Sequence, residues 1–203
     1  MIQGLTVTLS IFFITLLLAL PLGLMLAFMR LSKNKLIKNI SRTYILVFRG
    51  TPLLLQLIFI FFGLPLVGVV FNRFNAAIVA FTLNYAAYFA EIYRGAILGI
   101  DKGQYEAALV LGMDKKTMYK RIILPQVIKK ILSPMSNEII TLIKDTSIVY
   151  TIGLNDILRI AQISQNQQVS LIPLIEVGLV YLILVGIITK IFKIIENKYS
   201  YYV

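Results

Sequence analysis

GQYEAALVLGMDKKTMYKRIILPQ, residues 103–126, lies within the one substantial polar insertion of an otherwise apolar sequence. Residues 106–111 suit a helix, and Gly112 is able to turn left-handed at the end of it. Asp114 can then cap a second helix, and Pro125 marks the return of the chain toward the next apolar segment. The stretch therefore predicts two short helices that meet at a corner.

The composition around this stretch is that of a membrane protein. The chain has 203 residues, of which 59% are hydrophobic and 14% are charged, whereas soluble domains carry about a quarter charged residues. The apolar residues fall in long runs, as membrane spans require. The sequence contains no Cys and no His, so the usual zinc, haem and iron–sulfur ligand sets are absent and no metal site is expected.

Five candidate spans can be read along the chain, and together they predict an all-α, multi-pass membrane protein with five transmembrane helices. The spans cover residues 4–29, 52–71, 74–93, 131–152 and 171–195. We expect residues 1–203 to form a single transmembrane domain, with the loop at 101–126 outside the membrane. The apolar N-terminal stretch lacks a basic start and a cleavage site, so it is not interpreted as a signal peptide.

The second span has readable ends. Thr51 is placed to cap it, and Pro52 falls at its first position, where the missing N–H costs nothing. Gly63 and Pro65 predict a break or bend near its far end.

Lys and Arg residues gather on one side of the predicted spans. They follow the first span, separate the third from the fourth, and recur after the fifth, as Arg30, Lys33, Lys35, Lys38, Arg42, Arg49, Arg94, Lys102, Lys115, Lys116, Lys120, Arg121, Lys129, Lys130, Lys190, Lys193 and Lys198. The opposite side holds Arg73 and Arg159. The positive-inside rule puts the N-terminus outside and the C-terminus in the cytoplasm. The formal charge of +11 is therefore interpreted as topology and not as nucleic-acid binding, because few aromatics are interleaved with the basic residues.

The 103–126 stretch resembles the EAA loop of ABC importer permeases, in which Glu-Ala-Ala is followed by a Gly four residues later and then by Ile-x-Leu-Pro. Seven positions match in register: Glu106, Ala107, Ala108, Gly112, Ile122, Leu124 and Pro125. Residues 49–56, 90–95 and 144–147 and the Gly-Leu-Thr-Val-Thr-Leu near the N-terminus resemble the branch that takes up polar amino acids, as in histidine, arginine or glutamine permeases. The resemblance covers nearly the whole chain.

This resemblance implies a type I ABC importer permease fold, a bacterial cytoplasmic membrane location and a set of partners. In that family the loop is a coupling helix that docks on an ATPase subunit, and the seven matched residues would make that contact. Two ATPase subunits, a second permease that is identical or homologous, and an extracytoplasmic amino-acid-binding protein are implied. ATP and Mg would bind to the ATPase and no cofactor to this chain, which lacks a phosphate-binding loop: residues 112–117 offer only one of the two glycines.

Polar residues inside the spans are the candidates for a substrate pathway, because they are costly in a membrane. On a helical wheel, one face of the fourth span is polar and one face of the third repeats the pattern more lightly. The candidates are Gln56, Asn84, Tyr88, Glu138, Thr141 and Asp145. With two acids against the single base Lys144, we expect an amine or a cationic amino acid to be tolerated. Ala86, Ala87 and Ala90 lie elsewhere on the third span and would allow close helix approach.

Other interpretations stay open from the sequence alone. The polar residues could instead pair internally, with Lys144 neutralising an acid on a neighbouring helix and Glu91 pairing with Arg94. A channel or an ion-gradient-driven transporter is the alternative function, although inverted repeats are not seen. An intramembrane enzyme is disfavoured because no nucleophile or acid–base pair can be argued.

Overall fold

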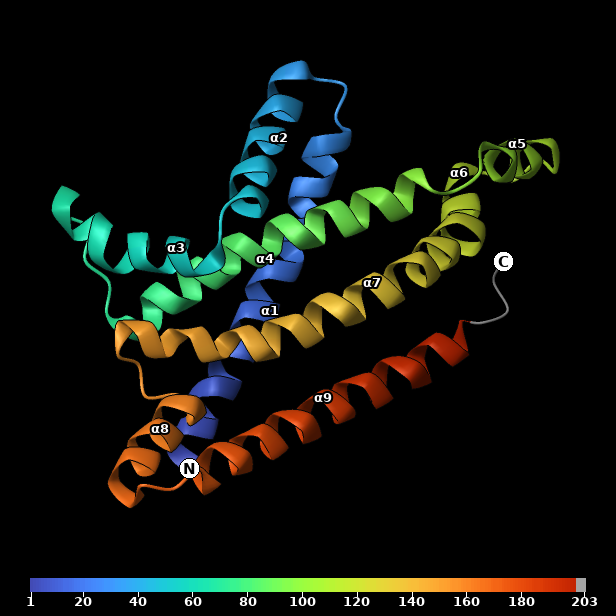
Figure 1. Cartoon of the computed structure of the whole chain (residues 1–203). Helices are drawn as coiled ribbons and strands as arrows, with labels where there is room; N and C mark the ends of the chain where they lie inside the picture. The colour runs from blue at the N-terminus through green and yellow to red at the C-terminus, as the bar shows by residue number, and fades with distance from the viewer. Residues whose placement is uncertain (200–203) are drawn as a thin grey trace.

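The computed structural model describes residues 1–199, and the regular structure of this part of the chain is helical throughout (Figure 1). The α-helices are α1 (Ile2–Leu31), α2 (Lys35–Gly50), α3 (Leu53–Ile58), α4 (Arg73–Leu98), α5 (Lys102–Val110), α6 (Lys115–Met118), α7 (Leu124–Asp145), α8 (Ile157–Gln168) and α9 (Ile172–Lys198). Shorter turns extend them: a π-helical turn at Phe59–Gly63, 3-10 turns at Leu64–Val67 and Thr146–Ile152, and a π-helical turn at Tyr119–Ile123. The predicted all-α fold is confirmed.

The centre of the fold is the crossing of α1 over α4. Ala19 of α1 and Ala86 and Ala90 of α4 are fully buried there. A Cβ atom on Gly23 would lie 2.8 Å from the Cβ of Phe89 and 3.0 Å from the carbonyl oxygen of Ala86. The two backbones therefore touch without room for a side chain, as small residues permit in membrane helices. The expectation that the alanines of the third span allow close helix approach is confirmed.

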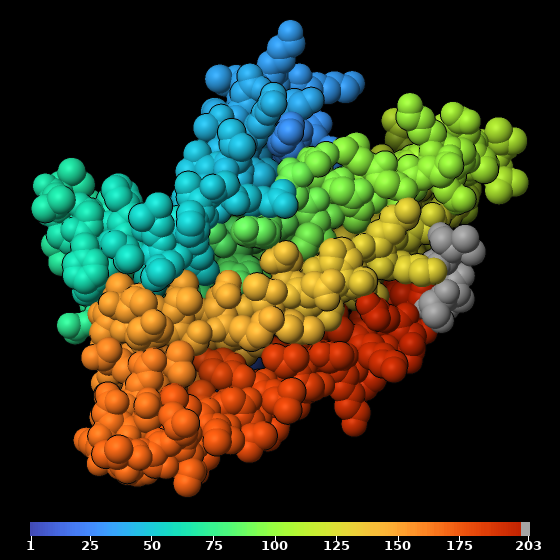
Figure 2. Space-filling model, in the orientation of Figure 1, coloured from blue at the N-terminus to red at the C-terminus, as the bar shows by residue number. Residues whose placement is uncertain are grey.

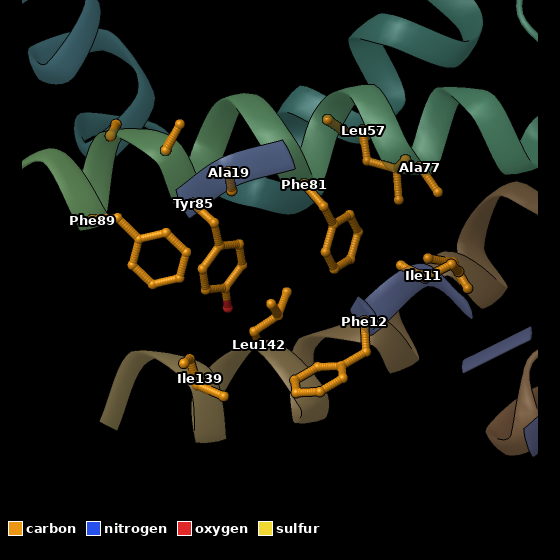
Figure 3. Close-up of a cluster of buried hydrophobic side chains, with 14 of the residues drawn as sticks. Ile11, Phe12, Ala19, Leu57, Ala77, Phe81, Tyr85, Phe89, Ile139 and Leu142 are labelled. Carbon is orange, nitrogen blue, oxygen red and sulfur yellow. The ribbon is translucent and has the colours of Figure 1, made fainter. Parts of the chain in front are cut away.

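Large side chains fill the space between α4 and α7. Phe81, Tyr85 and Phe89 are fully buried or nearly so and extend from α4 toward Ile139 and Leu142 of α7 (Figure 3). This packing fixes which face of each helix points inward, and it therefore positions the polar residues described below.

Replacing Gly23 by leucine is expected to lower the thermal stability of the detergent-solubilised protein. The added side chain has no space between α1 and α4, and overpacking of this kind costs about 1–3 kcal/mol. The matched control is Gly186→Leu on α9, where a Cβ meets nothing within 4 Å. An equal melting temperature for the two variants would contradict the tight crossing.

Among residues 1–199, three helices are long and apolar enough to cross a membrane: α1, α4 and α9. A fourth crossing results if α2 and Leu53–Val67, which meet at an angle of 102°, are counted as one bent span. The expected fourth span, residues 131–152, lies mostly in α7. This helix has a polar face and is not among the helices apolar enough to cross. The count of five is thus not confirmed by length and composition.

The segment between the first two spans differs from the prediction, in which residues 30–49 form a loop. It is mostly the helix α2, which runs back along α1, and this hairpin projects from the body of the molecule (Figure 2). Asn34 starts α2 because its side-chain oxygen accepts the N–H groups of Leu36 and Ile37. The helix is amphipathic, and its many basic residues concealed that pattern.

The start of α3 differs from the prediction as well. Thr51 does not cap it, since its hydroxyl donates back to the Val47 carbonyl at 2.8 Å and accepts from Gln56. Pro52 precedes the helix and does not begin it. The expected break at Gly63 and Pro65 is confirmed, because the chain passes there from a π-helical turn into a 3-10 turn.

A helix that the sequence analysis missed, α8, follows α7. Asp156 caps it by accepting the N–H groups of Leu158 and Arg159, and the buried face of α8 packs on α1 and α9. A Cβ on Gly4 would lie 2.8 Å from the backbone of Asp156, so α1 and the start of α8 are in direct contact. The segment was too polar and too short to be recognised as a span.

Candidate functional site

Residues 101–126 form the two helices and the corner that the sequence predicts. The Asp101 carboxylate accepts the Gly103 N–H at 2.6 Å and starts α5. Gly112 follows the helix with a φ of 70°, in the left-handed region where only glycine is unstrained. Asp114 accepts the Thr117 N–H at 3.2 Å and caps α6, and hydrogen bonding from the Thr117 side chain, with that from its backbone N–H, lowers the pKa of the Asp114 carboxyl.

The helix α5 has one packed side and one bare side. Ala108 is 1% exposed and packs into a small core with Met118 and Ile123. Three consecutive apolar residues at the end of the helix are exposed: Leu109 by 57%, Val110 by 87% and, directly after α5, Leu111 by 77%. An apolar patch of this kind on a short helix away from the main bundle is characteristic of a protein-interaction surface.

The other matched residues surround this surface. Glu106 and Ala107 are exposed on α5. Ile122 packs partly against the small core, Leu124 is exposed, and Pro125 lies in the first turn of α7. The segment connects the end of α4 to the start of α7 (Figure 1).

Gln56 and Asn84 are bonded to each other at the bend between α2 and α3. The Asn84 amide nitrogen donates to the Phe48 carbonyl at 2.8 Å and to Gln56 Oε1 at 3.1 Å. Gln56 Nε2 donates to the Phe48 carbonyl and to both oxygens of Thr51. Asn84 is only 4% exposed. These two side chains tie the bend to α4, and their hydrogen-bonding groups are directed into the protein.

One acid of α7 is hydrogen-bonded to a tyrosine of α4, and a second acid lies elsewhere on the same helix. Tyr85 donates its hydroxyl hydrogen to Asp145 Oδ2 at 2.7 Å. Glu138 is half-buried on the same helix, two turns before Asp145. The Thr141 hydroxyl donates to the carbonyl of Asn137 at 2.9 Å, so its oxygen can still accept a hydrogen bond.

Tyr88 lies one turn from Tyr85 and links this cluster to α2. The two rings are 6.2 Å apart, and the Arg49 guanidinium lies over the Tyr88 ring at 5.1 Å. Glu91 forms an ion pair with Arg94 at 2.6 Å. This pairing was the structural alternative for Glu91, and it is confirmed.

Residues 19–201 match the model of the family described as "Binding-protein-dependent transport system inner membrane component". The chain belongs to this family. The family is the membrane component of such systems, so the prediction of a transport subunit, with ATP hydrolysis on a separate subunit, is confirmed.

Individual relatives agree with the family assignment. The permease is 45% identical to the arginine transport system permease protein ArtQ of Bacillus subtilis (strain 168), over 97% of this chain and 91% of that protein. It is 35% identical to the L-cystine transport system permease protein TcyB of the same organism, over 98% of this chain and 86% of that protein.

Solved structures show the same fold. The crystal structure of an amino acid ABC transporter with histidines matches with a TM-score of 0.88 and 37% identity, covering 97% of this chain and 92% of that chain. The inward-facing MetNI methionine ABC transporter matches with a TM-score of 0.74 at 22% identity, over 98% and 95% of the two chains, which concerns the fold alone. The expected type I ABC importer permease fold and inner-membrane location are thereby confirmed, and the family description implies an ATPase and a binding protein as partners.

Two residues of the permease site were missed in the sequence. Tyr85 was passed over because the wheel of the third span grouped Asn84, Tyr88 and Glu91, whereas the face that meets α7 carries Tyr85. Arg49 was predicted as a topology signal and as part of the 49–56 family motif but not as a site residue, although its place in the last turn of α2 brings it to Tyr88. Lys144 forms no ion pair with another described residue (1–199), and it lines a cavity beside α8 and α9. Within the same range, no cluster of three or more His, Cys, Asp or Glu side chains is placed to hold a metal ion.

Proposed function

We propose that this permease imports polar amino acids, with cationic ones accepted, in an importer driven by ATP. The observation that carries the substrate class is the pair of carboxylates on α7: Asp145, which accepts a hydrogen bond from Tyr85, and the half-buried Glu138 two turns before it. The arginine and cystine permeases among its relatives, and the amino acid transporter that shares its fold, support the same class.

Coupling to ATP is proposed to occur through the bare side of α5. The exposed Leu109, Val110 and Leu111 would be buried in a groove of the ATPase, with Glu106 beside them to meet polar groups of that subunit. The full set of contacts is Glu106, Ala107, Ala108, Gly112, Ile122, Leu124 and Pro125. ATP and Mg would be held by the ATPase, and no cofactor by this chain.

The substrate pathway is proposed to follow the polar faces of α4 and α7. Tyr88, Glu138, Thr141 and Asp145 have groups that can hydrogen-bond an amine or a carboxylate. Gln56 and Asn84 belong to the same proposal, although their amides already bond to each other and to the bend. Charged and polar groups at this depth are usually retained for transport or for internal pairing.

The assembly is proposed to contain two copies of the permease unit 1–203, or this chain and a homologue, each bound to one of two ATPase subunits and surrounded by membrane lipid. An extracytoplasmic binding protein would deliver the amino acid. The N-terminus would lie outside and the C-terminus in the cytoplasm, as the distribution of Lys and Arg indicates. ATP binding must favour one access state by several kcal/mol to switch the population fully.

The substrate proposal is tested by Glu138→Gln in proteoliposomes that contain the complete transporter. We expect uptake of cationic amino acids to fall by roughly tenfold, because one charge-assisted hydrogen bond is worth about 1.5–3 kcal/mol. Uptake of neutral amino acids should change little. The control is Glu176→Gln on α9, outside the polar cluster. Unchanged selectivity and rate would remove Glu138 from the site.

The same proteoliposomes distinguish an ATP-driven importer from the main alternative, a secondary transporter. A secondary transporter moves its substrate on an ion gradient without any other subunit. This chain should be inert when its ATPase is omitted, and uptake on a gradient alone would favour the alternative.

A further inference from the structure

A basic cavity lies between the α1–α2 hairpin and α4. It has a volume of about 460 Å³, and three guanidinium groups line it: Arg30 from α1, and Arg42 and Arg49 from α2. The one acid in its wall, Glu91, is held by Arg94 through three hydrogen bonds of 2.6–3.0 Å. The cavity therefore presents an excess of positive charge.

Among these three arginines, Arg49 has the most specific placement. Its guanidinium is oriented by the ring of Tyr88 at 5.1 Å, and no hydrogen bond or ion pair joins it to another side chain among residues 1–199. The five N–H donors of this group are thus free to bind an anion. A guanidinium fork matches the two oxygens of a carboxylate.

The opposite charge lies close by. Tyr88 and Tyr85 link Arg49 to Asp145 through a cation–π contact, a ring contact and one hydrogen bond, and Glu138 lies two turns before Asp145 on α7. The two tyrosines of α4 therefore connect the positive group on α2 with a negative group on α7. An amino acid carries the complementary pair of charges, a carboxylate and an ammonium group.

We infer that Arg49 binds the α-carboxylate of the transported amino acid, while the positive groups of the substrate turn toward Glu138 and Asp145. This inference rests on the proposed function and sharpens it. The site then selects intact α-amino acids and excludes amines that have lost the carboxylate, even though the two acids alone would attract such amines. The cavity of about 460 Å³ is large enough for the carboxylate end of an amino acid, and Glu138 and Asp145 lie outside its lining.

The inference is tested by direct binding to the complete permease–ATPase complex in nanodiscs, without the binding protein. L-Arginine is compared with agmatine, which is arginine without its carboxylate, by isothermal titration calorimetry. We expect the wild-type complex to prefer L-arginine by at least tenfold, and Arg49→Gln to bring the two affinities within about threefold of each other. Lys38→Gln, which removes a charge from the same helix outside the cavity, should keep the wild-type preference.

Each outcome is decisive. A preference for L-arginine that survives in Arg49→Gln overturns the assignment of Arg49 and leaves the proposed function standing. An equal loss of affinity for both ligands in Arg49→Gln shows a structural role and also overturns the assignment. If the wild-type complex binds neither L-arginine nor any other amino acid in a screen of all twenty, the proposed substrate class and this inference both fail. Arg49→Lys, which keeps the charge but loses the fork, is expected to recover only part of the preference.

Discussion

Replacing Gly112 by valine is expected to abolish ATP-driven uptake, with a loss of at least tenfold, while the permease still inserts and binds lipid. Gly112 has a φ of 70°, and a Cβ atom added to it would meet nothing within 4 Å, so its backbone angle alone demands glycine. A β-branched residue in that region is strained by about 1–3 kcal/mol. The corner would open, and Leu109–Leu111 would no longer face the proposed ATPase groove. Uptake in proteoliposomes measures the effect.

A matched control separates the corner from a general loss of glycine. Gly95→Val introduces the same side chain in α4, where the φ is not positive and nothing lies within 4 Å of the new Cβ atom. It should transport at close to the wild-type rate. Copurification with the ATPase should weaken for Gly112→Val and not for Gly95→Val. Full uptake by Gly112→Val would remove α5 as the element that transmits the motion.

The sequence predicted the corner well because its signals are local. Gly112 and Asp114 act through their own backbone and the next turn, so residue type and spacing are sufficient to place them. The apolar spans α1 and α9 were found for a similar reason, since length and hydropathy alone identify them. The family motif depended on these same short-range features.

The features that were not predicted, the helices α2 and α8 and the role of Tyr85, depend on contacts between distant parts of the chain. Both α2 and α8 are amphipathic and polar, and their helical state depends on packing against α1 and α4 or against α1 and α9. No window of the sequence contains those contacts. A wheel shows which residues share a face but not which neighbour that face meets, and one residue of difference is a turn of 100°. That is why Asn84 was grouped with the pathway while Tyr85, which bonds to Asp145, was not considered.

The hydrogen bonds at the bend lead to a second prediction with a large effect. Asn84→Leu is expected to destabilise the permease by about 1–3 kcal/mol, because Gln56 Oε1 loses its donor in a buried setting. The Phe48 carbonyl keeps the bond from Gln56, so the bend should loosen without breaking. The melting temperature of the purified protein measures the change, and Asn137→Leu, at an exposed site on α7, is the control.

A double-mutant cycle decides between this structural role and a place in the pathway. If Gln56 and Asn84 act chiefly on each other, Gln56→Leu with Asn84→Leu should cost less than the sum of the single changes, since neither amide is then left unpaired. Additive losses, together with altered selectivity of uptake and an unchanged melting temperature for Asn84→Leu, would place Asn84 in contact with the amino acid. The buried position of Asn84 and its two short bonds into the bend favour the first result, because a side chain that must release its partners to meet each substrate would loosen the bend at every turnover.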